Sequence, residues 1–77
     1  MEDRAMIERH LAQAEEHVTL GESHIVRQKQ IVADMERDGH VEAALIAREL
    51  LETFESTQES HLGDRDRLRA ELSACRL

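Results

Sequence analysis

Mostly apolar residues recur through most of this 77-residue chain at alternating intervals of three and four. This is the spacing of a helix that packs along one side. In the first half, with a glycine and a glutamine included, the series is Ile7, Leu11, Ala14, Val18, Gly21, Ile25, Gln28, Val32 and Met35. The second half continues the rhythm at Ala44, Ala47, Leu51, Phe54, Gln58, His61, Arg65, Leu68 and Leu72. We call these positions the seam. The pattern predicts two helices, at about residues 3–36 and about residues 41–74.

The stretch RDGH, residues 37–40, separates the two series and is expected to form the turn at Asp38 and Gly39. Glycine suits the left-handed position that ends a helix. Two helices of similar length joined by a short connection pack antiparallel, so we expect a single all-α domain over residues 1–77, a coiled-coil-like helical hairpin. Gly63 leaves open a break in the second helix, but the unbroken seam spacing favours one continuous helix.

The turn also predicts the register of the hairpin, in which seam residues whose numbers add to 79 share a layer. The ends of the hairpin are then apolar, whereas the middle is weakly filled because Gly21 meets Gln58. Phe54, the single aromatic residue, is expected to lean into the space that Gly21 leaves. Val18 is expected to share a layer with His61.

More large apolar residues lie off the seam than a lone hairpin can bury, because two helices share only one seam. They include Leu20 and a group concentrated toward the turn. This wide apolar surface predicts a homodimer in which two hairpins form a four-helix bundle. The expected interface residues are Val26, Ile31, Met35, Val41, Leu45, Ile46, Leu50 and Leu62.

The composition argues against several classes of partner and location. The formal net charge is -7, so a nucleic acid or an anionic membrane is an unfavourable partner. No apolar run approaches the roughly 18 residues that cross a bilayer, and the N-terminal residues lack the apolar core of a signal peptide. Because Cys75 has no second cysteine to pair with, the expected compartment is the reducing cytoplasm.

Three histidines, His10, His17 and His24, recur every seven residues, each directly before a seam residue. Seven helical residues rise about 10.5 Å, so no two of them can bind one metal ion from the same helix. The expected register places His10 opposite Glu71 and His17 opposite Asp64. The simplest hypothesis is that these histidines pack at the edge of the seam with hydrogen-bonded tips.

Two functional hypotheses for the histidines stay open. His17, His61 and Asp64 would supply two imidazoles and one carboxylate at mid-hairpin, a ligand set suitable for zinc. Alternatively, histidines that face carboxylates would act as a pH sensor.

On the other side of the seam, the same register predicts a favourable pair between Glu8 and Arg69. It places Lys29 near Arg48, which would be mildly repulsive.

The segments RHLAQAEEHV, GESHI and RQKQIV, then RDGH, then ARELLETFESTQESHL and DRDRL, span almost the whole chain from Arg9 to Leu68. Together they resemble a family of short, uncharacterised alphaproteobacterial helical-hairpin proteins with an RDGH turn. The resemblance implies a small bacterial protein in the cytoplasm. It implies no activity, ligand or catalytic residue.

No phosphate-binding loop, nucleophile elbow or pair of catalytic carboxylates occurs in the sequence, so we expect no enzyme and no cofactor. The favoured hypothesis is a non-enzymatic interaction module that dimerises and presents an acidic outer face to an unknown protein partner. The alternative is a small metal-binding protein that uses His17, His61 and Asp64. A third hypothesis is an acidic regulator that masks a basic surface on another protein.

Overall fold

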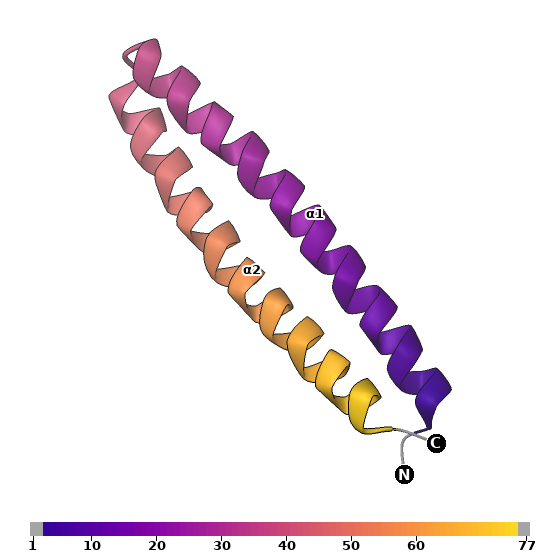
Figure 1. Cartoon of the computed structure of the whole chain (residues 1–77). Coiled ribbons are helices and arrows are strands. Elements are labelled where there is room, and N and C mark those ends of the chain that lie inside the picture. The colour runs from indigo at the N-terminus through magenta and orange to yellow at the C-terminus, as the bar shows by residue number, and fades with distance from the viewer. Residues whose placement is uncertain (1–2, 76–77) are drawn as a thin grey trace.

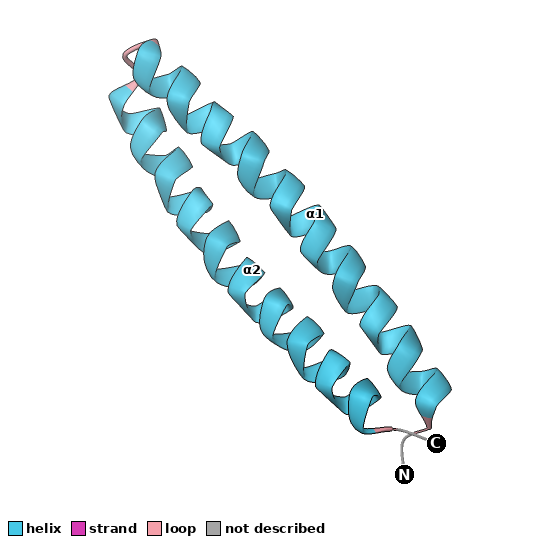
Figure 2. Ribbon diagram, in the orientation of Figure 1, coloured by secondary structure: helices cyan, strands magenta, loops and turns pink. Residues whose placement is uncertain are grey.

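The computed structural model describes residues 3–75, and all of their regular structure is helical. Helix α1 spans Arg4–Arg37 and helix α2 spans Val41–Ala74. The helices run antiparallel, side by side, in a rod 59 Å long and 14 Å wide (Figures 1 and 2). The predicted all-helical hairpin is therefore confirmed. The helix bounds lie within one residue of the expected ones.

Local hydrogen bonds and the conformation of Gly39 explain where α1 begins and ends. Asp3 accepts a hydrogen bond from the backbone N–H of Met6 at 2.8 Å, which caps the first turn. At the other end, Gly39 adopts a φ of 75°, in the left-handed region. The N–H of Gly39 donates to the carbonyl of Glu36, and the N–H of His40 donates to that of Met35. This is a Schellman motif, and it reverses the chain at the predicted turn.

Helix α2 continues through Gly63 without a break, as the seam spacing favoured. Gly63 is exposed, and beyond its own stretch of helix no atom of the described residues lies within 4 Å of the place where a Cβ would sit. The helix therefore tolerates Gly63, and no packing contact among residues 3–75 requires a glycine at this position.

The core follows the seam but is thin. No side chain of residues 3–75 is completely enclosed, and several large seam residues, such as Ile25 and Phe54, are only half-buried. At the open end of the hairpin, Leu11, Leu72 and Cys75 pack against the buried cluster of Ile7, Ala14 and Leu68. Among residues 3–75, the buried residues are Ile7, Ala14, Val18, Gln28, Val32, Ala44, Ala47, Gln58 and Leu68.

Two buried glutamines tie the helices together across the seam. Gln28 of α1 donates from Nε2 to the backbone carbonyl of Ala47, and Gln58 of α2 donates from Nε2 to that of Val18, each at 2.9 Å. A buried hydrogen bond of this kind contributes about 1 kcal/mol, and leaving the amide unpaired costs more. Because each bond joins a side chain to the opposite backbone, a register shift would break it. The glutamines therefore help to fix the register.

Gly21 provides the space that Gln58 needs, as the shared layer predicted. A Cβ built on Gly21 would lie 1.8 Å from Oε1 of Gln58. That oxygen is buried without a hydrogen-bond partner and faces a Cα–H of Gly21, a weak donor. The expectation that Phe54 would fill this space is wrong. The carboxamide occupies it because from there it reaches the carbonyl of Val18, while Phe54 remains half-buried beside His24.

The two helical glycines should respond in opposite ways to alanine. Gly63→Ala should stabilise the protein by about 1 kcal/mol, because alanine favours the helix and the added methyl meets nothing. Thermal unfolding followed by circular dichroism at fixed protein concentration measures the change.

Gly21→Ala should instead lower the free energy of unfolding by about 1–2 kcal/mol. Its methyl displaces the Gln58 carboxamide from the Val18 carbonyl, and this loss outweighs the gain in helix propensity. In the background of Gln58→Ala, the same substitution should become neutral or stabilising. Equal stabilisation by both alanines in the native background would contradict the close packing at Gly21.

Candidate functional site

The two flanks of the seam differ in chemistry. Residues directly before a seam residue, such as His17 and Thr57, lie on one side, which we call the histidine flank. Residues directly after a seam residue, such as Glu15 and Arg69, lie on the other side, which we call the acidic flank. Contacts between the helices follow this division: His17 meets His61 across the first flank, and Glu15 meets Arg69 across the second.

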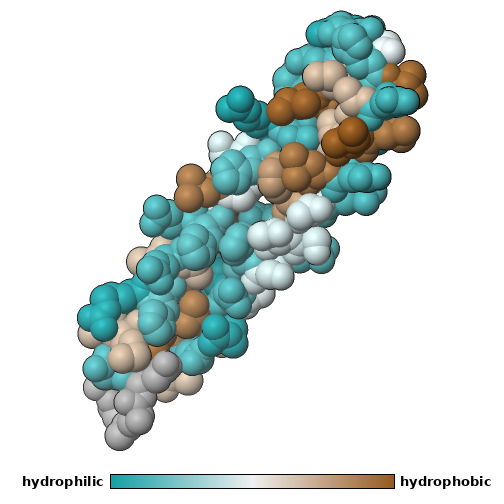
Figure 3. Space-filling view, turned by 180° about the vertical axis from the view of Figure 1, so that it is seen from behind, coloured by the Kyte–Doolittle hydropathy of each residue, from teal (hydrophilic) through white to brown (hydrophobic). Residues whose placement is uncertain are grey.

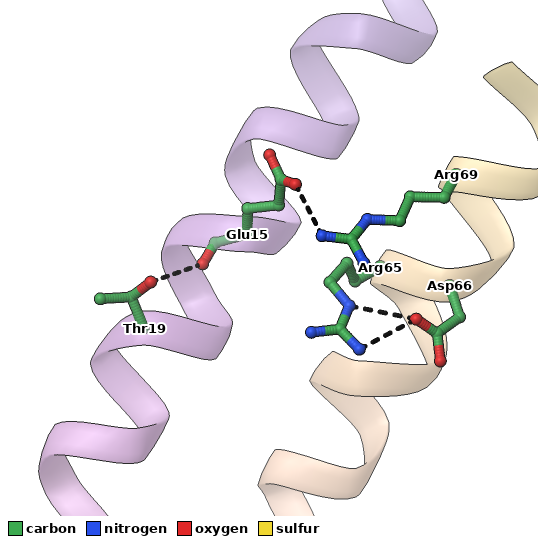
Figure 4. A network of polar contacts seen from close by, with 5 residues as sticks. All are labelled: Glu15, Thr19, Arg65, Asp66 and Arg69. Atoms are coloured by element: carbon green, nitrogen blue, oxygen red, sulfur yellow. Dashed lines mark hydrogen bonds and ion pairs between the residues drawn. The ribbon is translucent and has the colours of Figure 1, made fainter.

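Exposed ion pairs cross the acidic flank. Arg69 pairs with Glu15 at 3.1 Å, and nearer the turn Arg48 pairs with Glu36 (Figure 4 shows the first pair). Thr19 donates to the backbone carbonyl of Glu15 at 3.1 Å. These charged side chains are about half exposed, so each pair contributes roughly 1 kcal/mol or less.

The predicted pair between Glu8 and Arg69 is wrong, and both arginines of this flank reach toward the turn. Arg69 was expected beside Glu8 and Arg48 beside Lys29, but both arginines pair with a glutamate nearer the turn. Side chains on a helix slant toward its N-terminus. For α2 that direction is toward the turn, so each long arginine reaches a layer closer to it. Glu8 pairs within α1 instead, with Arg4 at 3.8 Å.

Charge is concentrated on the acidic flank. Its acidic residues are Glu8, Glu15, Glu22, Glu36, Glu52, Glu55, Glu59 and Asp66, and its basic residues are Lys29, Arg48 and Arg69. The histidine flank is close to balance, with the acids Asp34, Asp64 and Glu71 and the bases Arg27 and Arg67. Most of the negative charge of the hairpin therefore points away from the histidines.

Large apolar residues of the histidine flank are left uncovered. Leu20, Ile46 and Leu50 are 49%, 67% and 43% exposed, and Ile31 is half-buried. In the space-filling view, apolar residues gather toward the turn end of the rod, at the upper right (Figure 3). A monomeric hairpin cannot hide them, because its single seam is already formed.

The eight expected interface residues do not share one flank. Four lie on the histidine flank or on the adjoining seam, namely Ile31, Met35, Ile46 and Leu50. The other four lie on the acidic flank, namely Val26, Val41, Leu45 and Leu62. A single flat interface can therefore cover only half of the set. This division follows from the sequence, because the flank of a residue depends only on whether the residue precedes or follows a seam position.

A hollow of about 180 Å³ opens on the histidine flank at mid-hairpin. Gly21 and the exposed Leu20 are both part of its lining. The complete lining is His17, Leu20, Gly21, His24, Phe54, Thr57, Gln58 and His61. The sequence indicates the weak layer of Gly21 and Gln58 but not the hollow, because the walls of the hollow come from both helices.

Two ring contacts frame this hollow. The imidazoles of His17 and His61 have ring centres 5.1 Å apart, with planes tilted by 43°. The ring of His24 lies 5.8 Å from that of Phe54. His17 is exposed, whereas His61 is half-buried because it occupies a seam position.

Asp64, the third residue of the predicted metal set, lies beside this pair. It lines a second, polar hollow together with His10 and His17. Among residues 3–75, no group of three or more histidine, cysteine, aspartate or glutamate side chains is gathered closely enough to hold a metal ion. The structure thus brings His17 and His61 together and leaves the Asp64 carboxylate outside the pair.

Comparisons with known proteins do not place the chain in a family. No family model, no curated protein and no solved structure matches it. Within residues 3–75, neither helix has an apolar stretch long enough to cross a membrane. The two flanks and the histidine pair are therefore the features that bear on function.

The charge of the acidic flank should make stability increase with salt. Raising NaCl from about 0.02 M to about 0.5 M should increase the melting temperature by about 3–5 °C, because screening relieves the repulsion among the carboxylates. Differential scanning calorimetry measures the shift.

The double variant Glu52→Gln, Glu59→Gln is the control, since it removes two acidic-flank charges that make no ion pair among the described residues. It should show a smaller gain with salt. A melting temperature that falls as NaCl rises would mean that the ion pairs of Glu15 and Glu36 outweigh the repulsion.

Proposed function

We propose that this protein is a non-enzymatic interaction module whose histidine flank binds a second copy of the chain, so that two hairpins form a four-helix bundle. The acidic flanks then face outward, toward solvent and a further protein partner. The observation that carries the proposal is the coincidence of exposed apolar residues with low charge on one flank. Leu20, Ile46 and Leu50 lie there, and the carboxylates lie mainly on the other side.

The burial within one hairpin supports this proposal. Three of its buried residues are alanines and two are glutamines, and none of residues 3–75 is completely enclosed. Chains of this size rarely bury enough apolar surface alone, and oligomerisation commonly supplies the rest. A second hairpin on the histidine flank would cover the half-buried Ile31 and Phe54 together with the exposed leucines.

Charge favours a second copy on this flank over the other. Two copies carry the same net charge of -7, so any contact between them works against repulsion. That repulsion is smallest where the local charges nearly balance, as they do around Arg27 and Asp34 on the histidine flank. Docking through the acidic flanks would bring like charges together.

The dimensions also fit a dimer. The rod is 59 Å long and 14 Å wide, so a second hairpin lying along the histidine flank would contact it over several helical turns. The hollow of about 180 Å³ is smaller than the roughly 300–1,000 Å³ of small-molecule pockets. It suits a single large side chain inserted from the partner, as in the knobs-into-holes packing of helices.

Leu50→Glu should weaken the dimer about 100-fold or more, because it places a charge in the centre of the proposed apolar interface. Leu45→Glu is the matched control. Leu45 is a leucine of similar exposure, 52% against 43%, but lies on the acidic flank. Sedimentation equilibrium of both variants and of the native chain measures the dissociation constants, with circular dichroism reporting helix content.

The control variant should remain as dimeric as the native chain. The proposal fails if the native protein is monomeric at micromolar concentration, or if Leu50→Glu leaves the dimer intact. It also fails if Leu45→Glu dissociates the dimer while Leu50→Glu does not, because the interface would then lie on the acidic flank.

A further inference from the structure

The rings of His17 and His61 are spaced as two imidazoles on one metal ion are spaced. With metal–nitrogen bonds of about 2.0–2.1 Å and tetrahedral angles, two imidazoles on one ion have ring centres roughly 5 Å apart. The observed separation is 5.1 Å, and the tilt of 43° shows that the rings are not stacked face to face. Among the histidines of the histidine flank, His24 contacts a phenyl ring instead.

The two imidazoles come from different helices, which makes the pair a property of the fold. His17 is carried by α1 and His61 by α2, so the seam holds their backbones at a fixed distance. His61 is half-buried, and packing restricts its ring, whereas the exposed ring of His17 can adjust. A site built on two packed helices needs little reorganisation when an ion binds.

Asp64 is placed to supply a third ligand. It follows His61 by three residues, about one turn along α2, and it lines a hollow with His17. Within residues 3–75 the Asp64 carboxylate makes no hydrogen bond or ion pair, so no partner must be broken before it turns. Two imidazoles and one carboxylate with an open fourth position form a ligand set that binds zinc and related ions.

We propose that His17 and His61 bind a first-row transition-metal cation of the Zn²⁺ or Co²⁺ kind, with Asp64 turning inward as the third ligand and water as the fourth. The site belongs to a single hairpin, and it does not depend on the proposed dimer. Binding would crosslink α1 and α2 near their midpoints, where the seam is weakest, and would therefore stabilise the hairpin.

The test is titration of the chain, purified without a histidine tag, with Co²⁺ and with Zn²⁺. Visible absorption of Co²⁺ reports a low-coordinate site, and calorimetry with Zn²⁺ gives stoichiometry and affinity. We expect one ion per chain and a melting temperature raised by about 5 °C or more at saturating Zn²⁺. His17→Gln and His61→Gln should each weaken binding about tenfold or more, and Asp64→Asn should weaken it several-fold.

His24→Gln and His40→Gln are the matched controls, since they remove an imidazole from the same flank and from the turn. Both should bind as the native chain does. Because His17 is exposed, His17→Gln tests the site even if His61→Gln disturbs folding. The Leu50→Glu variant, even as a monomer, should still bind one ion per chain, which separates this inference from the proposed dimer.

The inference is overturned if the native chain binds no Zn²⁺ at about 1 mM, which would leave a dissociation constant too weak for a three-ligand site. It is also overturned if His24→Gln weakens binding as much as His61→Gln. One ion per two chains, lost in Leu50→Glu, would place the ion between hairpins and contradict a site within one of them.

Discussion

Two helices joined by a short turn share a single seam, and that constraint shapes the rest of this molecule. One seam buries one row of residues from each helix, so every apolar residue outside it stays at least partly exposed. Here the row itself includes Gln28 and Gln58, whose carboxamides bind the opposite backbone instead of filling the core. The hairpin gains a defined register from these bonds, and its core remains thin.

The weakest part of the seam is also where its chemistry is concentrated. Gly21 admits the carboxamide of Gln58, and both residues line a hollow that His17 and His61 also border. The polar middle therefore gives up some burial and leaves a site within reach of solvent. Both the proposed partner side chain and the proposed metal ion would restore contacts at this point.

The two flanks of the rod differ in charge, and this difference separates their proposed roles. Its nearly balanced charge is what distinguishes the histidine flank, which we propose binds a second hairpin. The carboxylates of the acidic flank keep that side hydrated, and its arginines bridge the helices from outside. The direction of these bridges follows from the slant of helical side chains toward the N-terminus. This is why Arg69 reaches Glu15, and the expected partner Glu8 pairs within its own helix.

The sequence by itself determined the helices, the turn and the layer that joins Gly21 to Gln58, because these depend on local spacing and on the conformation of Gly39. The two flanks also follow from the sequence, although the predicted interface included residues of both flanks. Only the tertiary structure decided which side chains meet across the seam. The ring of His17 contacts that of His61 while sharing a hollow with Asp64, and Gln58 takes the space expected for Phe54. Such contacts depend on rotamers and on the reach of side chains from two helices at once, and spacing along one chain does not specify these.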